Sequence, residues 1–372
     1  MQAVRVVDNE EPYELRTVPV PPANDLGAHD LIVKVATASY CHTDSMVAAG
    51  VFGTQLPVTA SHEGAGTVVR ASSASGFLVG DRVMCGLPFH PCGECGDCRH
   101  VDGGEGEGEG KEGKEGKEGE GRQQYCPRAE GHVGVHIDGC FAEYVRVDAR
   151  FTTKLPEGVS LLDAAPLACA GRTVWRAIQQ TNLKKGQWIA LVGSGGGLGH
   201  LGIQFATKAL GLRVLAIDAR DGPLELSKEL GAEAVLDARL GKSEVVEWAQ
   251  IVTGGHGADA TVVLADSPGA CALGCAVTRM HGTVVQVAQP EEVCVPFQEI
   301  VFRDIRLKGS LLCSPAESRA MLEAVAEHGI EVKSDVFHGL ESIEELMDMV
   351  NKGKIQGKAV ILVDQGQIDE EK

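Results

Sequence analysis

Hydrophobic and polar positions follow different patterns in the two parts of the chain. Up to about Phe151, short apolar stretches such as Leu31–Thr37 and Gly66–Val69 alternate with Gly- and Pro-rich segments such as Gly80-Asp81. This pattern is typical of strands joined by turns. After Ser160, a suitable helix N-cap, apolar strands alternate with segments of helical periodicity. The first part therefore predicts a mostly β domain, and the second predicts a parallel, doubly wound α/β sheet.

The predicted elements divide the chain into a split domain and an inserted one. In the alternating part we expect helices at 160–180, 198–210 and from 223 to 230, and strands at 188–192, 213–218, 259–264 and 283–287. From about Leu307 mixed elements return, with amphipathic helices near Ala316–His328 and Ser342–Asn351. We therefore expect one domain built from residues 1–170 and 307–372, with a nucleotide-binding domain, 171–306, inserted between them.

A glycine-rich run joins the first predicted strand and helix of the inserted domain. Its glycines would let the backbone approach a pyrophosphate at the N-terminus of the helix. The strict G-x-G-x-x-G spacing is not met, because Leu198 stands where the third Gly should be and that Gly is shifted to 199. Asp218, at the end of the next strand, is placed to bind the adenosine ribose and to favour NAD over NADP, although it could be an ordinary solvated acid. Arg220 keeps a phosphate-binding alternative open. The predicted loop residues are Gly193, Gly195, Gly196, Gly197, Leu198 and Gly199.

Composition and charge narrow the class of protein. The 372 residues are 44% hydrophobic, enough for a sizeable core in two domains, and carry a net charge of −18. Nucleic acid and anionic membranes are therefore poor partners. We read no leader and no apolar run long enough to span a membrane, so we expect a soluble, cytoplasmic protein with reduced cysteines. We expect six of the 12 cysteines to be small buried hydrophobes: Cys85, Cys140, Cys271, Cys275, Cys294 and Cys313.

Four other cysteines have the spacing of a structural zinc site. Cys92, Cys95 and Cys98 are each separated by two residues, and Cys126 supplies a fourth thiolate. Between them lies a run of Glu-Gly and Lys-Glu-Gly units, residues 103–121, which holds nothing apolar and is predicted to be disordered. The longer loop would cost about 1.2 kcal/mol in closure entropy. Structural zinc contributes on the order of 10 kcal/mol, so the site should tolerate the insert.

Three stretches far apart in the chain each carry a group that binds zinc. They are Cys41-His42-Thr43-Asp44, Ser61-His62-Glu63 and Cys169-Ala170-Gly171. Two Cys and one His leave a fourth coordination position open, which is typical of catalytic zinc. Asp44 and Glu63 could accept the second ring N–H of His62, balance the metal charge, or be ordinary surface acids. Thr43 could accept the proton of an alcohol. No local pattern shows that the three stretches meet.

Together these motifs resemble those of the zinc-dependent alcohol dehydrogenases of the medium-chain dehydrogenase/reductase family, in particular its fungal branch. The resemblance spans nearly the whole chain. It rests on the four-cysteine segment, the glycine run, Tyr40–Asp44, His62–Gly66, Asp138-Gly139, Leu167–Thr173 and Lys354–Lys358.

The resemblance implies a GroES-like catalytic domain, a Rossmann domain, two zinc ions per subunit and a homo-oligomer, with a tetramer favoured. It implies that Cys41, His62 and Cys169 hold the catalytic zinc, with Glu63 as an occasional ligand or a group behind the ligands. Thr43 would be the first proton-relay residue. His42 and Lys358 would lie near the cofactor pyrophosphate, and Thr173 near the nicotinamide.

The chain departs from the family pattern at four positions. The histidine that usually ends the proton relay is replaced by Met46, so the proton must leave through another group or water. Phe52 and Leu87 stand where small-alcohol enzymes of this branch carry indoles, and the smaller Leu87 suggests room for a substrate larger than ethanol. Ser61 replaces a Gly, a change that we expect to be minor.

We therefore expect an enzyme that interconverts an alcohol and an aldehyde or ketone by hydride transfer with NAD(H). The nearest alternative is a biosynthetic reductase of a larger aldehyde or enone. A zinc-free quinone or enoyl reductase of the same fold would lack the Cys41, His62 and Cys169 set. A non-catalytic protein that uses the charged repeat as its binding element is a further alternative.

Overall fold

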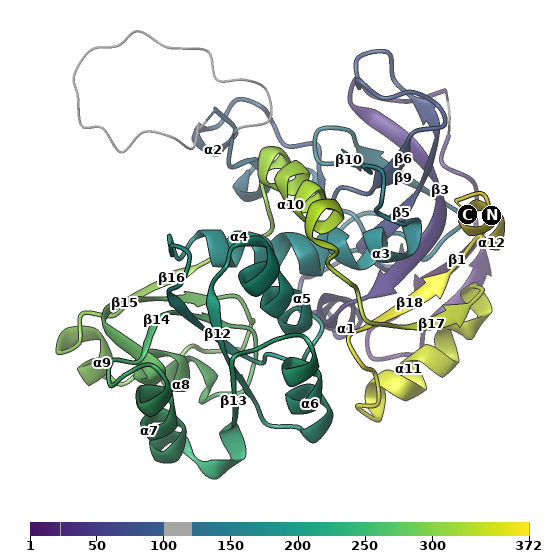
Figure 1. Ribbon diagram of the computed structural model, residues 1–372. Coiled ribbons are helices and arrows are strands. Elements are labelled where there is room, and N and C mark those ends of the chain that lie inside the picture. Colours follow the sequence, from purple (N-terminus) through teal and green to yellow (C-terminus); the bar gives the residue numbers. More distant parts are fainter. Residues whose placement is uncertain (23, 100–120, 372) are drawn as a thin grey trace, which may run out of the picture. The chain divides into compact units, whose positions relative to one another are not determined.

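The computed structural model describes residues 1–22, 24–99 and 121–371, which form two compact units (Figure 1). Unit 1 consists of Met1–Cys169, Cys313–Glu323 and Asp335–Lys372, and unit 2 of Ala170–Leu312 and Ala324–Ser334. The expected boundary at 306/307 would cut strand β16 (Arg306–Gly309), which pairs with β15 (Thr278–Gln286) in unit 2. The chain therefore returns to unit 1 only at Cys313. Apart from Gly121, the predicted disordered insert 103–121 lies outside the described residues.

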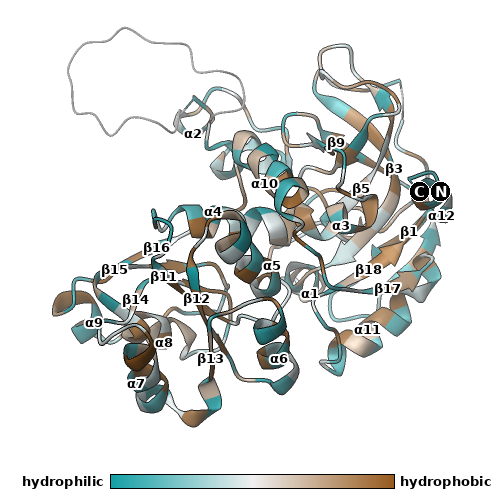
Figure 2. Ribbon diagram, viewed as in Figure 1, coloured by the Kyte–Doolittle hydropathy of each residue, from teal (hydrophilic) through white to brown (hydrophobic). Residues whose placement is uncertain are grey.

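Unit 2 is built on a six-stranded sheet in which all neighbouring strands are parallel. The strand order is β13-β12-β11-β14-β15-β16, which is the doubly wound order in which the direction of winding reverses between β11 and β14. The remaining strands are β11 (Trp188–Val192), β12 (Arg213–Asp218), β13 (Ala234–Asp237) and β14 (Ala258–Val263). β11 is buried throughout and has hydrophobic colours in Figure 2, as expected for a central parallel strand.

The helices of unit 2 alternate with these strands (Figure 1). They are α4 (Arg172–Gln179), α5 (Gly199–Gln204), α6 (Asp221–Glu229), α7 (Lys242–Val252), α8 (Ala270–Val277) and α9 (Phe297–Val301), with a short 3₁₀ turn at Ala238–Leu240. The helix expected at 198–210 exists, but its second half, Phe205–Ala209, is π-helical. The sequence analysis did not predict β13, β16, α7, α8 and α9.

Unit 1 is mostly β. A seven-stranded sheet has the order β10-β6-β5-β3-β18-β17, with β9 also paired to β3. A three-stranded sheet, β2-β1-β4, and the pair β7-β8 complete it. The strands are β1 (Gln2–Val6), β2 (Glu14–Thr17), β3 (Asp30–Tyr40), β4 (Val58–Thr59), β5 (Glu63–Ala71), β6 (Arg82–Met84), β7 (Pro88–Phe89), β8 (Gly131–His132), β9 (Tyr144–Asp148), β10 (Thr153–Lys154), β17 (Ser334–His338) and β18 (Lys358–Leu362). The predicted pairing of a mostly β domain with a doubly wound α/β domain is confirmed.

Helices of unit 1 are short and flank the sheets. They are α1 (His42–Ala48), α2 (Gly96–Arg99), α3 (Leu161–Pro166), α11 (Ile343–Asn351) and α12 (Gln365–Asp369), with 3₁₀ turns at Gln123–Tyr125 and Leu340–Ser342. Helix α10 (Pro315–His328) begins in unit 1 and ends in unit 2. A π-helical turn, Leu167–Gly171, follows α3. Within the described ranges, every helix is too short or too polar to span a bilayer.

Burial of the six cysteines follows the prediction with one exception. Cys85, Cys140, Cys271, Cys275 and Cys313 are buried, but Cys294 is exposed. The prediction for Cys294 was wrong because its segment, between β15 and α9, is extended over the surface. An apolar neighbourhood in sequence does not bury a residue that no element of the sheet covers.

Candidate metal centres and cofactor site

Cys41 lies at the junction where β3 ends and α1 begins. It is the N-cap of α1, and its backbone N–H donates to Oδ2 of Asp44 at 2.9 Å. A carboxylate in the first turn of a helix satisfies free N–H groups and interacts favourably with the positive end of the helix dipole. Asp44 therefore fixes the backbone that carries the Cys41 thiol.

The second carboxylate oxygen of Asp44 orients His62. Oδ1 lies 3.1 Å from Nδ1 of His62, and both side chains are 1% exposed. Because an ionised carboxylate only accepts, Nδ1 carries the hydrogen, and Nε2 is buried without a hydrogen-bond partner in the described part of the chain. Burial alone would lower the pKa of His62, but Asp44 raises it well above its usual value. A metal bound at Nε2 would displace a proton there.

The three predicted stretches meet in unit 1. One ligand atom from each of Cys41, His62, Glu63 and Cys169 lies within 4.8 Å of all the others. Cys169 is presented from the π-helical turn Leu167–Gly171, a feature frequent at functional sites. A hydrogen bond with Cys169 lowers the pKa of Cys41 well below that of an ordinary thiol, and the charge of Lys358 adds to the effect. Two thiols and an unpartnered buried imidazole nitrogen fit zinc.

Lys358 and Glu63 form a buried ion pair beside this cluster. Their Nζ and Oε2 atoms are 2.6 Å apart, with side-chain exposures of 5% and 0%, and the Ser39 hydroxyl donates to the same oxygen. Burial raises the pKa of Glu63 to about 7, against the opposing effect of Lys358. The structure thus pairs the Lys358 ammonium with a carboxylate, and its expected place near the cofactor pyrophosphate stays a prediction. Register explains the ion pair: β18 and β5 both pair with β3, with Ala359 opposite Tyr40 and Glu63 opposite Ser39.

The four spaced cysteines form a second, separate cluster in unit 1. Three of the Sγ···Sγ separations are 3.6, 3.8 and 3.9 Å. Zinc bound tetrahedrally at about 2.3 Å from each sulfur requires Sγ atoms about 3.8 Å apart. Backbone N–H groups already donate to the sulfurs, as Cys95 does to Cys92 and Cys98 does to Cys95. The cluster fits a closed structural site made of Cys92, Cys95, Cys98 and Cys126.

The glycine run lies in unit 2 between β11 and α5, as predicted. A Cβ on Gly195 would come within 2.2 Å of the Pro223 carbonyl oxygen, and Gly193 has a φ of +90°. Both positions therefore require glycine. Asp218 ends β12 and accepts the Gly195 N–H at 3.2 Å, while Arg220 Nε lies 3.4 Å from its other oxygen. Asp218 thus holds the glycine run through this hydrogen bond, and it also lies at the strand end where a cofactor ribose is expected.

The other predicted residues are placed as follows. Thr43 is half-buried and His42 exposed, and both lie in the first turn of α1 in unit 1. Thr173 is buried in α4 of unit 2. Met46 and Phe52 are half-buried, and Leu87 is buried, all in unit 1.

Ser61, next to His62, has an unusual backbone conformation and makes hydrogen bonds. Its φ is +70°, in the left-handed region that favours glycine. Its hydroxyl donates to the Ser39 carbonyl at 2.9 Å, and the same oxygen accepts the Glu63 N–H at 3.3 Å. The serine therefore combines backbone strain with contacts that hold the strand on either side of His62, and the expectation that its net effect is minor stays a prediction.

Comparison with known proteins agrees with this arrangement. Residues 27–157 match the alcohol dehydrogenase GroES-like domain, and residues 197–327 match the zinc-binding dehydrogenase domain. An alcohol dehydrogenase of Geobacillus stearothermophilus is 32% identical over 370 residues, which cover 98% of this chain and all of that protein. The chain belongs to the zinc-binding dehydrogenase family.

Solved structures of this family share the fold along the whole chain. The alcohol dehydrogenase of the hyperthermophilic archaeon Aeropyrum pernix is 27% identical, with a TM-score of 0.82, over 97% of this chain and all of that one. A cinnamyl alcohol dehydrogenase of Sorghum bicolor is 25% identical, with a TM-score of 0.81, over 97% of each chain. Unit 1 of this zinc-binding dehydrogenase is therefore GroES-like, and unit 2 is Rossmann-like.

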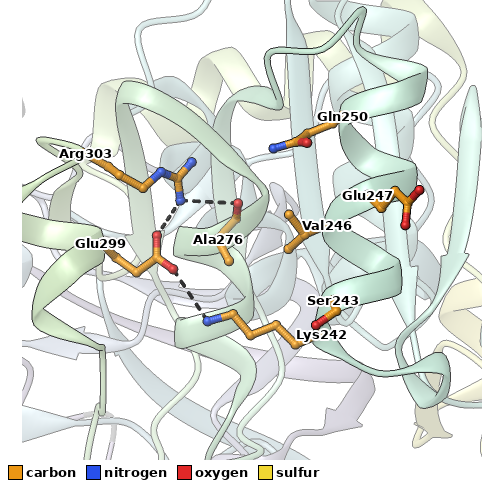
Figure 3. A pocket seen from close by; sticks show the side chains of 8 residues that line it. All are labelled: Lys242, Ser243, Val246, Glu247, Gln250, Ala276, Glu299 and Arg303. Carbon is orange, nitrogen blue, oxygen red and sulfur yellow. Dashed lines mark hydrogen bonds and ion pairs between the residues drawn. The ribbon is translucent and has the colours of Figure 1, made fainter.

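The dehydrogenase also has an open pocket of about 510 Å³ in unit 2, lined from α7, α8 and α9 (Figure 3). Within it Glu299 pairs with Arg303, and its other oxygen lies 3.5 Å from Lys242. Arg303 also donates to the Ala276 carbonyl at 3.3 Å. Both cations are already paired with Glu299, so we assign no ligand to this pocket. The lining residues are Lys242, Ser243, Val246, Glu247, Gln250, Ala276, Glu299 and Arg303.

Proposed function

We propose that this zinc-binding dehydrogenase interconverts an alcohol and an aldehyde or ketone by hydride transfer with NAD(H). The observation that supports this most strongly is the convergence of Cys41, His62 and Cys169 around the unpartnered Nε2 of His62. A zinc ion bound there would acidify an alcohol or polarise a carbonyl. We propose these three residues as its ligands and Glu63 as a group behind them.

The chain's own residues hold this site in one geometry. Asp44 fixes both the Cys41 backbone and the His62 ring through its two oxygens. Lys358 balances the negative charge of Glu63 and of the nearby thiols, so that the buried cluster is not a set of anions alone. Hydrogen bonds and charges behind metal ligands tune the affinity for the metal and the orientation of the ligating side chains.

The proton of the alcohol needs a path out of the site. We propose Thr43, in the first turn of α1, as its first acceptor. Met46, one turn further along α1, has a thioether and cannot carry a proton onwards. The proton therefore leaves through water or another side chain, and the pH dependence should differ from that of a relay ending in histidine.

We propose NAD rather than NADP as the cofactor. The loop residues Gly193, Gly195 to Gly197, Leu198 and Gly199 would hold the pyrophosphate at the N-terminus of α5. Asp218 would bind the adenosine ribose, and its charge disfavours a 2′-phosphate. His42 and Thr173 are proposed as further cofactor contacts. Arg220, 60% exposed beside Asp218, is the feature that favours the NADP alternative.

A second candidate function is reduction of a larger aldehyde or enone. Leu87 is smaller than the indole expected at that position in small-alcohol enzymes, and a structural relative at 25% identity is named a cinnamyl alcohol dehydrogenase. From the motifs that carry the family resemblance, we also propose two zinc ions per subunit and a cytoplasmic homotetramer. From the same motifs, we propose that the chain lies nearest the fungal branch.

A substrate panel tests this proposal. Zinc per subunit would be measured first, and kcat/KM then compared for ethanol, long-chain and aromatic alcohols with NAD and with NADP. We expect about two zinc ions, turnover with NAD, and a preference for the bulkier alcohols. Turnover of carbonyls or enones alone would favour the reductase. Absence of both zinc and turnover would overturn the proposal.

A further inference from the structure

Three polar side chains of one helix in unit 2 bind the main chain of a neighbouring segment. His200, Gln204 and Lys208 follow each other at intervals of four residues along α5 and its π-helical continuation, so they lie on one face. Opposite them runs the segment Gly329–Lys333, which lies between α10 and β17. We call this set of contacts the backbone ladder.

Two members of the ladder, Gln204 and Lys208, bind this segment, and the Gln204 amide also donates to the main-chain carbonyl of His200 at 3.2 Å. The Gln204 amide donates to the Glu331 carbonyl at 2.8 Å and accepts the Glu331 N–H at 3.0 Å. The Lys208 ammonium donates to the Gly329 carbonyl and to the Gln204 Oε1, each at 3.1 Å. Gln204 is fully buried, so these contacts satisfy groups that would otherwise be costly to bury. In the described part of the chain, the hydrogen bonds of Gln204 and Lys208 do not reach the glycine run.

His200 differs because it binds in two directions. Its Nδ1 lies 3.1 Å from the Gly196 carbonyl oxygen, and its Nε2 lies 3.2 Å from the backbone nitrogen of Lys333. A carbonyl only accepts and a backbone N–H only donates. The ring must therefore carry its hydrogen on Nδ1 and keep Nε2 as an acceptor. The side chain is fully buried, which leaves it no solvent as an alternative partner.

The Gly196 carbonyl is held from two sides by the same residue. It accepts the backbone N–H of His200 at 3.1 Å as well as the ring N–H. A glycine peptide has the widest conformational choice in the chain, and fixing its carbonyl fixes the N–H of the next residue. The Gly197 N–H is one of the groups that a bound pyrophosphate would meet.

We propose that His200 is a positioning residue for the cofactor. Through Nδ1 it sets the peptide between Gly196 and Gly197 in the orientation that binds a pyrophosphate, and through Nε2 it is itself held by Lys333. This inference rests on the proposed NAD site. It assigns His200 no contact with substrate or reacting atoms, so it predicts an effect on cofactor affinity and none on the rate at saturating cofactor.

Two conservative variants separate the two contacts of His200. His200→Asn keeps a donor at the place of Nδ1 and loses the acceptor for Lys333. His200→Gln keeps an acceptor at the place of Nε2 and loses the donor to Gly196. Gln204→Met is the matched control, since it breaks the ladder one turn further along; it removes a bond to the His200 main-chain carbonyl but none to the His200 ring or to the glycine run.

The measurement is NADH binding by fluorescence titration, with thermal unfolding of each variant in parallel. We expect the Kd of His200→Gln to rise about tenfold, the worth of one lost hydrogen bond, with kcat at saturating NAD unchanged. His200→Asn and Gln204→Met should stay within about threefold of wild type in Kd although their Tm falls.

The result that would overturn the inference is equal weakening of NADH binding in His200→Asn and His200→Gln, or weakening in Gln204→Met as large as in His200→Gln. Unchanged binding in His200→Gln beside a wild type that binds NADH would also overturn it, and would leave the proposed function intact. A wild type that binds neither NADH nor NADPH would overturn the cofactor site itself.

Discussion

The two cysteine clusters of unit 1 are built in opposite ways. The four-cysteine cluster draws its thiols from two short segments, and main-chain N–H groups donate to its sulfurs. The cluster at His62 draws ligands from three distant segments, and buried side chains support it: Asp44 behind the imidazole and Lys358 behind Glu63.

Because the two clusters are built differently, we expect them to have different functions. Four thiolates complete a tetrahedron and leave no room for a substrate, so the local cluster can only stabilise the fold. Three ligands leave a position open, and the buried charges around them can tune what binds there. Loss of a ligand should therefore affect catalysis at one cluster and stability at the other.

The largest effect is expected from Cys169→Ala. Removing this ligand should lower kcat by on the order of 10³-fold or more, because several kcal/mol of charge stabilisation are lost. NADH affinity should be unchanged, since no predicted loop residue is altered. Steady-state kinetics and NADH titration measure the two quantities.

The matched control is Cys85→Ala, which removes a buried thiol of the same unit outside both clusters. It should retain activity. Wild-type kcat in Cys169→Ala would refute the assignment of this residue as a ligand.

Cys126→Ala should instead act on stability. Loss of a metal site is among the few single changes that cost more than about 4 kcal/mol, so the Tm should fall sharply. The kcat of the protein that remains folded should stay near wild type. Calorimetry and zinc analysis measure this; a stable variant with lowered kcat would reverse the roles of the two clusters.

Lys358→Met tests the support behind the catalytic cluster. It leaves the buried Glu63 carboxylate without its partner, which should cost about 3–5 kcal/mol in the free energy of unfolding. Adding Glu63→Gln should restore much of the loss, because the uncompensated charge is then gone. Denaturant titration of the single and double variants gives the coupling energy, and a value near zero would show that the pair is dispensable.

The smallest effect concerns the strained residue next to His62. Ser61→Ala keeps a side chain at φ +70° and loses the hydroxyl contacts, so we expect a loss of about 1–2 kcal/mol. Ser61→Gly loses the same contacts but relieves about 1–2 kcal/mol of left-handed strain, so it should be near neutral. Equal destabilisation by both would show that the strain is negligible.

Local patterns predicted most of unit 2. Strands β11 and β12 have the expected bounds because continuous apolar runs between glycines and polar residues leave little choice of register. The four-cysteine cluster was equally predictable, since three of its cysteines, Cys92, Cys95 and Cys98, are separated by only two residues each. β13, with only four residues and mixed burial, gave no comparable signal.

Features that depend on tertiary register could not be predicted from pattern. Nothing near Lys358 indicates that it faces Glu63, because the contact comes from the pairing of β18 with β3. The sign of φ at Ser61 is likewise set by the strands that it joins. The resemblance indicated which cysteines belong together, and the fold shows them adjacent, while the zinc itself stays a prediction.

The position of β18 also has a consequence for biosynthesis. Because Lys358 lies on this strand, which inserts next to β3, the ribosome must have made residue 358 before the ion pair at Glu63 can form. The ligands of the four-cysteine cluster are all synthesised by residue 126. A metal bound at that cluster could therefore be captured during translation, whereas the cluster at His62 reaches its final charge balance only after residue 358 has been made.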